Sequence, residues 1–254
     1  MSQNVKEDLY PSFLMSVSLF GLFLVSMLAF NPPVAEEDLL WRKPVVGSIF
    51  GSICILGILA ALFPKECSGA SHFKKEETPA NKYNEPPQSM LASSRVYPSI
   101  LGHHPDCGNF SAHMFQIKNK TFCTSCTGLL LGALITLAGT ILYFFNNWQI
   151  SHESLLVVSV GIFGTGFGLL QFPLFKNRRG FLRFFLNAYF VLGTFFILIG
   201  IDTLVRSVAI DLFLIFLSVF WIFTRISLSQ WDHEQTCTAC GLTCVFRKPE
   251  KKWV

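Results

Sequence analysis

"FLRFFLNAYFVLGTFFILIGI", residues Phe181–Ile201, is an almost continuous apolar run that contains a single charged side chain. In the hydrocarbon core of a bilayer every backbone N–H and C=O group needs a partner, and a helix of about 20 apolar residues both supplies those partners and spans the core. A strand of a membrane barrel would instead alternate apolar and polar residues. This stretch therefore predicts a transmembrane helix.

Five further stretches have the same character: Ser12–Phe30, Pro44–Phe63, Thr127–Phe145, Ser154–Phe175 and Leu204–Phe223. The composition agrees, because 51% of the residues are hydrophobic and only 14% are charged, whereas soluble domains carry about 25% charged residues. The predicted fold class is an all-α integral membrane protein with six transmembrane helices. The first stretch is too long for a typical signal-peptide core and lacks a preceding basic region, although a cleaved signal is the alternative interpretation.

Lysine and arginine are distributed unevenly around these spans. Of the 20 Lys and Arg residues, only Arg42, Lys43 and Arg206 fall on one face of the membrane, and the other 17 fall on the opposite face. Because positively charged loops resist translocation, the richer face and both termini are predicted to be cytoplasmic in a multi-pass protein of the cell membrane. Two N-glycosylation sequons, at Asn109 and Asn119, support the inverted orientation instead.

The chain divides into five parts along its length. These are the first two spans (1–63), a flexible cytoplasmic linker (64–100), a Cys/His segment (101–126), spans three to six (127–223) and a cytoplasmic Cys-rich tail (224–254). The linker is polar and rich in proline, and it lacks the apolar residues that a folded core would need.

Cysteine and histidine gather in the Cys/His segment and in the tail, both on the predicted cytoplasmic side. Thiols stay reduced there, so clustered cysteines more often bind metal than form disulfides. Each part holds a CxxC pair, in which one tight turn can aim two sulfurs at one ion. The candidate ligands are His103, His104, Cys107, His113, Cys123 and Cys126 in the segment, and His233, Cys237, Cys240 and Cys244 in the tail.

The sequence is compatible with two arrangements of these ligands. Each part can close its own four-ligand site, or the two CxxC pairs can meet in one four-thiolate site while Cys107 and the histidines form a second centre. Zinc is the predicted cofactor because mixed histidine and cysteine ligation suits it, and an iron–sulfur cluster is the alternative if four thiolates converge. A third interpretation needs no metal. Cys123 and Cys126 stand at the start of a predicted helix, where the helix dipole stabilises a thiolate and suits a thiol–disulfide relay.

Several residues inside the spans stand out. Asp211 lies one to two turns into the last span, where an acid is costly and by default indicates a functional site. Pairing with Arg206 is the structural alternative to a proton or cation role. Arg183 and Asn187, four residues apart in the fifth span, are predicted to hydrogen-bond between helices. Cys54 is predicted to be a small core residue.

Three glycine pairs have GxxxG spacing, which lets helix backbones approach closely. They are predicted to pack helices within the chain, with a homodimer face as the alternative. The pairs are Gly47/Gly51, Gly128/Gly132 and Gly164/Gly168.

The pattern His103-His104-Pro105-x-Cys107-x-x-Phe110, followed by Cys123-x-x-Cys126-x-Gly128 before a span, resembles a group of uncharacterised multi-pass prokaryotic membrane proteins, a domain of unknown function. The likeness covers this segment and the general layout. It departs at Gly102, where the group carries a leading cysteine, and Cys107 is the candidate substitute. The resemblance is compatible with an archaeal origin and implies no activity.

The predicted function is that of a membrane-embedded scaffold or accessory subunit, in which structural zinc staples the loop and tail to the helix bundle. Its predicted partners are the lipid bilayer and a protein partner or larger membrane complex. No catalytic residue is identified, and a non-enzymatic role is favoured. The alternatives are a membrane metalloenzyme or thiol-redox protein that uses Cys123 and Cys126, and a small transporter that uses Asp211. Nucleic-acid binding is not predicted, because the basic residues lie at membrane boundaries and the net charge of +4 follows from topology.

Overall fold

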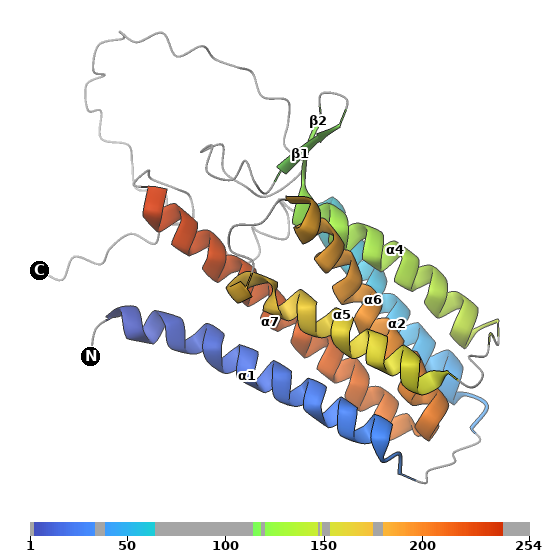
Figure 1. Cartoon of the computed structure of the whole chain (residues 1–254). Coiled ribbons are helices and arrows are strands. Elements are labelled where there is room, and N and C mark those ends of the chain that lie inside the picture. Colours follow the sequence, from blue (N-terminus) through green and yellow to red (C-terminus); the bar gives the residue numbers. More distant parts are fainter. Residues whose placement is uncertain are drawn as a thin grey trace, which may run out of the picture.

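The computed structural model of the protein describes residues 3–33, 39–63, 114–117, 120–146, 148, 153–174 and 180–240. These residues form six long helices and one short β-hairpin (Figure 1). The helices are α1 (Gln3–Phe30), α2 (Arg42–Leu62), α4 (Thr124–Phe144), α5 (Ser154–Leu174), α6 (Gly180–Val205) and α7 (Val208–Cys240). All six are long and apolar enough to cross a membrane, which confirms the prediction of six helices of that kind.

Successive helices alternate in direction along the bundle (Figure 1). The starts of α4 and α6 and the end of α2 therefore share one end with the β-hairpin, which we call the hairpin end. The opposite end, which we call the far end, holds the starts of α2 and α7 and the ends of α4 and α6. Helix α2 ends at, and helix α7 runs toward, the side of the bundle on which the β-hairpin lies (Figure 1).

Helix α6 lies at the centre of the bundle, with 61% of its span buried. Small residues on its neighbours allow this close packing. A methyl group added to Gly132 of α4 would lie 2.8 Å from the carbonyl oxygen of Ala188, and one added to Gly164 of α5 would lie 2.9 Å from that of Tyr189. The GxxxG pairs of α4 and α5 thus pack against α6 within the chain, as predicted.

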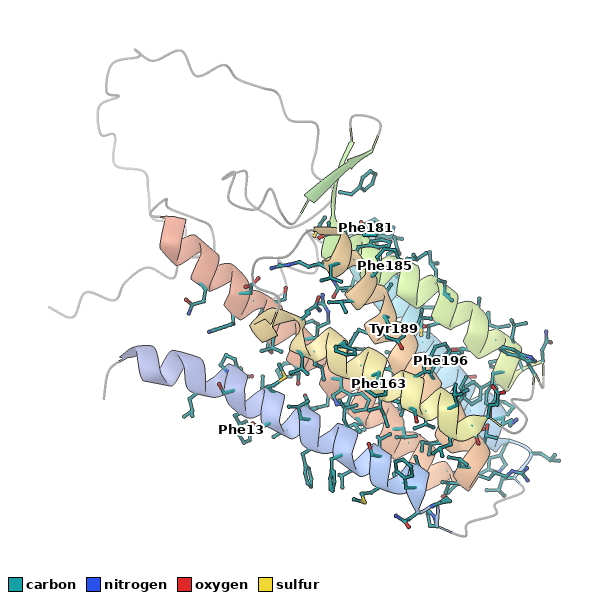
Figure 2. The ribbon with its side chains drawn as sticks, viewed as in Figure 1. Phe13, Phe163, Phe181, Phe185, Tyr189 and Phe196 are labelled. Carbon is teal, nitrogen blue, oxygen red and sulfur yellow. The ribbon has the colours of Figure 1, made fainter. Side chains whose placement is uncertain are left out.

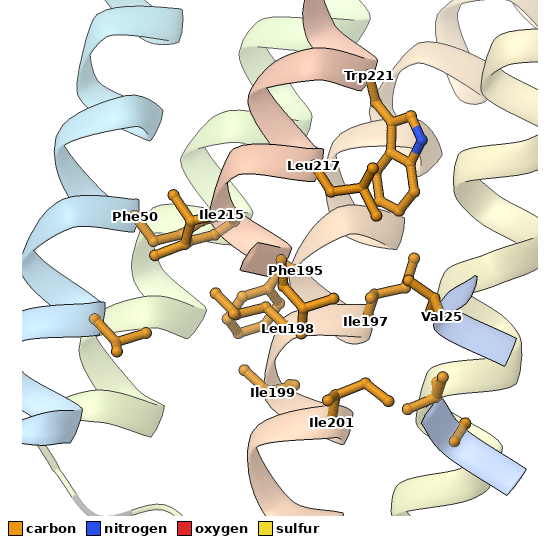
Figure 3. Close-up of a cluster of buried hydrophobic side chains, with 14 of the residues drawn as sticks. Val25, Phe50, Phe195, Ile197, Leu198, Ile199, Ile201, Ile215, Leu217 and Trp221 are labelled. Atoms are coloured by element: carbon orange, nitrogen blue, oxygen red, sulfur yellow. The ribbon is translucent and has the colours of Figure 1, made fainter. Parts of the chain in front are cut away.

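A cluster of buried apolar side chains fills the middle of the bundle (Figure 3). Phe50 of α2 stacks on Phe195 of α6, with ring centroids 6.3 Å apart, and Trp221 of α7 is fully buried. Cys54 belongs to the same cluster and is 5% exposed, which confirms its prediction as a core residue. The Trp221 indole N–H donates to the Ser18 carbonyl oxygen at 3.1 Å and so ties α1 to α7.

Large apolar side chains cover the outside of the bundle (Figure 2). Phe13 of α1 is 63% exposed, Phe163 of α5 is 61% exposed and Phe181 of α6 is 72% exposed. A surface of this kind is costly in water and suits contact with lipid chains. The outer surface therefore agrees with a bundle that sits in a membrane.

The structure differs from the sequence prediction in two places. Within the Cys/His segment, β1 (Met114–Ile117) pairs antiparallel with β2 (Lys120–Cys123), and Met114 lies opposite Cys123. The last helix does not stop at Phe223 but runs on to Cys240. Hydropathy finds the part of a helix that suits lipid, not the point where the helix ends, so the polar continuation of α7 was missed.

Candidate functional site

Buried polar side chains collect at both ends of the bundle. The thiol cluster, at the hairpin end, consists of Cys123, Cys126, Gln171, Arg183, Asn187, Arg225 and Asp232. The acid cluster, at the far end, consists of Arg42, Tyr143, Asp202 and Asp211. Each cluster joins helices that are distant in sequence, so each is a candidate functional site.

The two cysteines of the thiol cluster stand where the hairpin meets α4. Cys123 is the last residue of β2 and the residue before α4, with φ −74° and ψ 122°, and its side chain is fully buried. Cys126 lies in the first turn of α4, and the two thiols are in hydrogen-bonding contact. Neither sulfur is part of a disulfide. The Thr127 hydroxyl donates to the Cys123 carbonyl oxygen at 2.8 Å and so holds the joint between strand and helix.

Arg225 brings a positive charge to this joint from α7. Its guanidinium lies close enough to Cys123 and Cys126 to interact electrostatically with both. Its Nε donates to Oδ1 of Asn187 at 2.9 Å, and its Nη2 donates to the same oxygen. Gln171 of α5 also donates to this oxygen, at 2.9 Å. The Asn187 amide thus links α5, α6 and α7 directly beside the CxxC pair of α4.

A second buried arginine lies near the start of α6. Nη1 of Arg183 is 3.5 Å from Oδ2 of Asp232 on α7. The prediction that Arg183 and Asn187 bond between helices is therefore confirmed. Donors dominate the cluster, and Nδ2 of Asn187 is a buried amide without a hydrogen-bond partner among the residues that the structure describes. Such a site suits a ligand with negative charge.

The other predicted metal ligands fall largely outside the part of the chain that the structure describes. This holds for His103, His104, Cys107, His113 and Cys244, and for the side chains of His233, Cys237 and Cys240 on α7. Within the described ranges no group of three His, Cys, Asp or Glu side chains is placed to hold a metal ion. Cys123 and Cys126 are thus the two predicted ligands whose geometry is defined.

The course of α7 bears on how the tail ligands can be used. Arg225 lies beside Cys126, and Cys237 follows twelve residues later on the same helix, about 18 Å further along the axis. In Figure 1 the end of α7 stands apart from the start of α4. His233 and Cys240 are separated by about 10 Å along the axis of α7.

The acid cluster is centred on Arg42, the first residue of α2. Its Nη2 lies 2.8 Å from Oδ1 of Asp202 on α6, and its Nη1 donates to Oδ2 of Asp211 on α7 at 2.7 Å. Both carboxyl groups are 1% exposed. Asp211 therefore pairs with Arg42 of α2, whereas Arg206, the partner considered from the sequence, is an exposed residue at positive φ in the short joint between α6 and α7.

Tyr143 extends this cluster to α4. Its hydroxyl donates to Oδ2 of Asp202 at 2.6 Å, and Nζ of Lys43 lies 4.8 Å above its ring. In the sequence, Arg42 served only to predict the orientation in the membrane, and Asp202 was not recognised as a candidate site residue. The available signal was that a cation begins the second span and acids stand at the end of the fifth and the start of the sixth, all on one face of the membrane.

A shallow groove of about 560 Å³ lies between α1 and α7 near the far end. Its lining is apolar apart from Asn31, and Asp211 is not among the residues that line it. The groove therefore provides no polar route to Asp211, and it does not support the transporter alternative.

Comparison with known proteins adds no relative. The chain matches no protein-family model, no curated protein and no solved structure. The resemblance drawn from His103–Phe110 and the first CxxC pair stays a prediction, and the two clusters are interpreted from their own chemistry.

Proposed function

We propose that this multi-pass membrane protein carries a structural zinc site at its hairpin end and acts as a scaffold or accessory subunit rather than as an enzyme. The observation that carries the proposal is the pair of the buried Cys123 and the half-buried Cys126, held at the joint between β2 and α4 with Arg225 beside it. Two sulfurs from one tight turn are half of the tetrahedral set that zinc needs.

The hairpin register indicates where the other ligands come from. Met114 pairs with Cys123, so β1 begins beside Cys123, and His113 is the residue before Met114 in the sequence. His104 and Cys107 precede it in the same segment. We infer that this segment completes the site, with Cys107 and one histidine as the remaining ligands. Coordination would then fix the loop onto the start of α4, which a small Cys/His-rich segment cannot do with a hydrophobic core of its own.

The charges of the thiol cluster support this ligand set. A zinc ion with three thiolates and one neutral histidine carries one net negative charge, and such a group inside a bundle needs a nearby cation. Arg225 is that cation, since it interacts electrostatically with both Cys123 and Cys126. Buried thiols without a metal or a cation stay neutral and inert. Arg225 therefore fits a metal-bound pair better than a pair of unused core cysteines.

The proposed orientation places the hairpin end in the cytoplasm. It rests on the excess of Lys and Arg in the parts of the chain that adjoin this end. In that compartment thiols stay reduced, which a zinc–thiolate site requires. A closed four-ligand site leaves no position for a reacting water, so the proposed role is to hold a surface for a partner protein.

Elemental analysis of the detergent-purified protein tests the proposal. Wild type should contain zinc in whole-number stoichiometry, and Cys123→Ser should contain one zinc fewer per chain. Cys54→Ser is the matched control, because Cys54 is also buried but lies in the core of α2, away from the cluster, and it should keep the wild-type zinc content. Equal zinc in Cys123→Ser and wild type would contradict the proposal. So would metal-free protein in which Cys123 and Cys126 readily form a disulfide, and that second result would support the thiol–disulfide relay.

A further inference from the structure

The acid cluster holds two carboxyl groups and one arginine in a buried setting. Asp202, Asp211 and Arg42 are each 4% exposed or less. Of the other ionisable residues described near this end, Tyr143 is buried on α4, and Lys43 of α2 sits above the Tyr143 ring. Arg206 and Glu153, which lie just outside α6 and α5, are exposed. If both acids were ionised, one unit of negative charge would be left uncompensated inside the bundle, which is costly.

The hydrogen bonds leave one oxygen of each acid without a donor. Oδ2 of Asp211 accepts from Arg42, and Oδ2 of Asp202 accepts from Tyr143. Oδ1 of Asp211 is buried and has no hydrogen-bond partner among the described residues. Oδ1 of Asp202 is within ion-pair distance of Arg42 but outside hydrogen-bond geometry. The two carboxyl groups are neighbours, because Asp202 lies 2.8 Å and Asp211 lies 2.7 Å from the two terminal nitrogens of the same Arg42 guanidinium.

We propose that Asp202 and Asp211 form a proton-binding site and share one proton between their two carboxyl groups. Two carboxylates offer four acceptor oxygens and no donor, so a direct bond between them requires that one be protonated. One shared proton leaves the pair with a single negative charge, which Arg42 balances. The proton belongs to the pair rather than to either acid alone. This site is independent of the proposed zinc site.

Infrared spectroscopy of the purified protein tests the shared proton directly. A protonated carboxyl group has a carbonyl stretch that is absent from a carboxylate, and pH steps reveal it as a difference band. Wild type at neutral pH should show this band. The band should be absent from the Asp211→Asn and Asp202→Asn variants. Asp232→Asn, which removes a buried acid at the hairpin end, should keep it. A wild-type spectrum without the band at neutral pH, or a band that persists in both far-end variants, would overturn the proposal.

Stability against pH provides a second readout in case one variant folds poorly. If the folded pair holds a proton that the unfolded chain has released, the folded state binds more protons and loses stability as the pH rises. Thermal unfolding of wild type should therefore shift to lower temperature as the pH rises from about 4, where carboxyl groups of an unfolded chain ionise, to the pH at which the folded pair releases its proton. In the Asp211→Asn variant the new side-chain amide can donate to Asp202 in place of the proton, so this variant should show less of that shift. An equal shift in both proteins would contradict a shared proton.

Discussion

The two ends of the bundle handle buried charge in opposite ways. At the far end two carboxyl groups face one arginine, and the groups bond to one another across α2, α4, α6 and α7. At the hairpin end two arginines and donor-rich amides surround two thiols and one carboxylate. The first imbalance is corrected by a proton, whereas the second calls for an anionic group such as a zinc–thiolate centre. The sign of the excess buried charge at each end therefore indicates which kind of ligand that end can bind: a proton at the far end and an anionic group at the hairpin end.

The largest effect is expected from Arg42→Met. This change leaves Asp202 and Asp211 buried without their cation, and breaking a buried ion pair from one side costs about 3–5 kcal/mol. The expected result is a large loss of monodisperse protein and of the free energy of unfolding in detergent. Lys43→Met is the control, since Lys43 contacts only the face of the Tyr143 ring in this cluster, and its effect should be much smaller. Equal effects of the two changes would break the account of the far end.

Arg225→Met should have an intermediate effect that depends on metal. The change removes both donors that Arg225 gives to Oδ1 of Asn187, and loss of hydrogen bonds from a charged group costs about 1.5–3 kcal/mol. If Arg225 also balances a zinc–thiolate centre, the variant should bind zinc more weakly than wild type in competition with a chelator. Arg42→Met should leave zinc affinity unchanged in whatever fraction folds. Unchanged zinc affinity in Arg225→Met would remove the electrostatic argument for the metal.

The smallest effects are expected when a single hydrogen-bond donor is removed from either cluster. Tyr143→Phe removes the hydroxyl that donates to Asp202, and Gln171→Leu removes one of several donors to Asn187. We expect Tyr143→Phe to cost about 1 kcal/mol and Gln171→Leu to cost less, because Arg225 still donates to the same Asn187 oxygen. Chemical denaturation in detergent measures both. A larger loss of unfolding free energy in Gln171→Leu than in Tyr143→Phe would contradict this order, and it would show that the hydrogen bonds around Asn187 tolerate the loss of one donor less well than those of the acid cluster.

The spans could be predicted from the sequence because long apolar runs have a single physical solution in a bilayer. The partner of Asp211 could not, because Arg42 lies 169 positions away in the chain and no local pattern links them. The close contacts of Gly132 and Gly164 with α6 could be predicted from the GxxxG spacing, because glycines four residues apart on one helix face let another helix approach closely.

The hairpin was missed because Met114–Cys123 is short and was considered only for its ligands. Of the candidate metal site, the sequence identified Cys123 and Cys126 through their spacing. It gave no indication of Arg225 or Gln171, because these residues reach the CxxC pair only through the packing of α5 and α7 against α6.

The most direct test of the account is X-ray absorption at the zinc edge of the purified protein. The account predicts zinc with sulfur neighbours at about 2.3 Å and nitrogen neighbours at about 2.0–2.1 Å. The sulfur signal should fall when Cys123 and Cys126 are both changed to serine and should be unchanged in Cys54→Ser. Zinc surrounded only by oxygen and nitrogen in wild type, or a sulfur signal that is undiminished after loss of both Cys123 and Cys126, would contradict it.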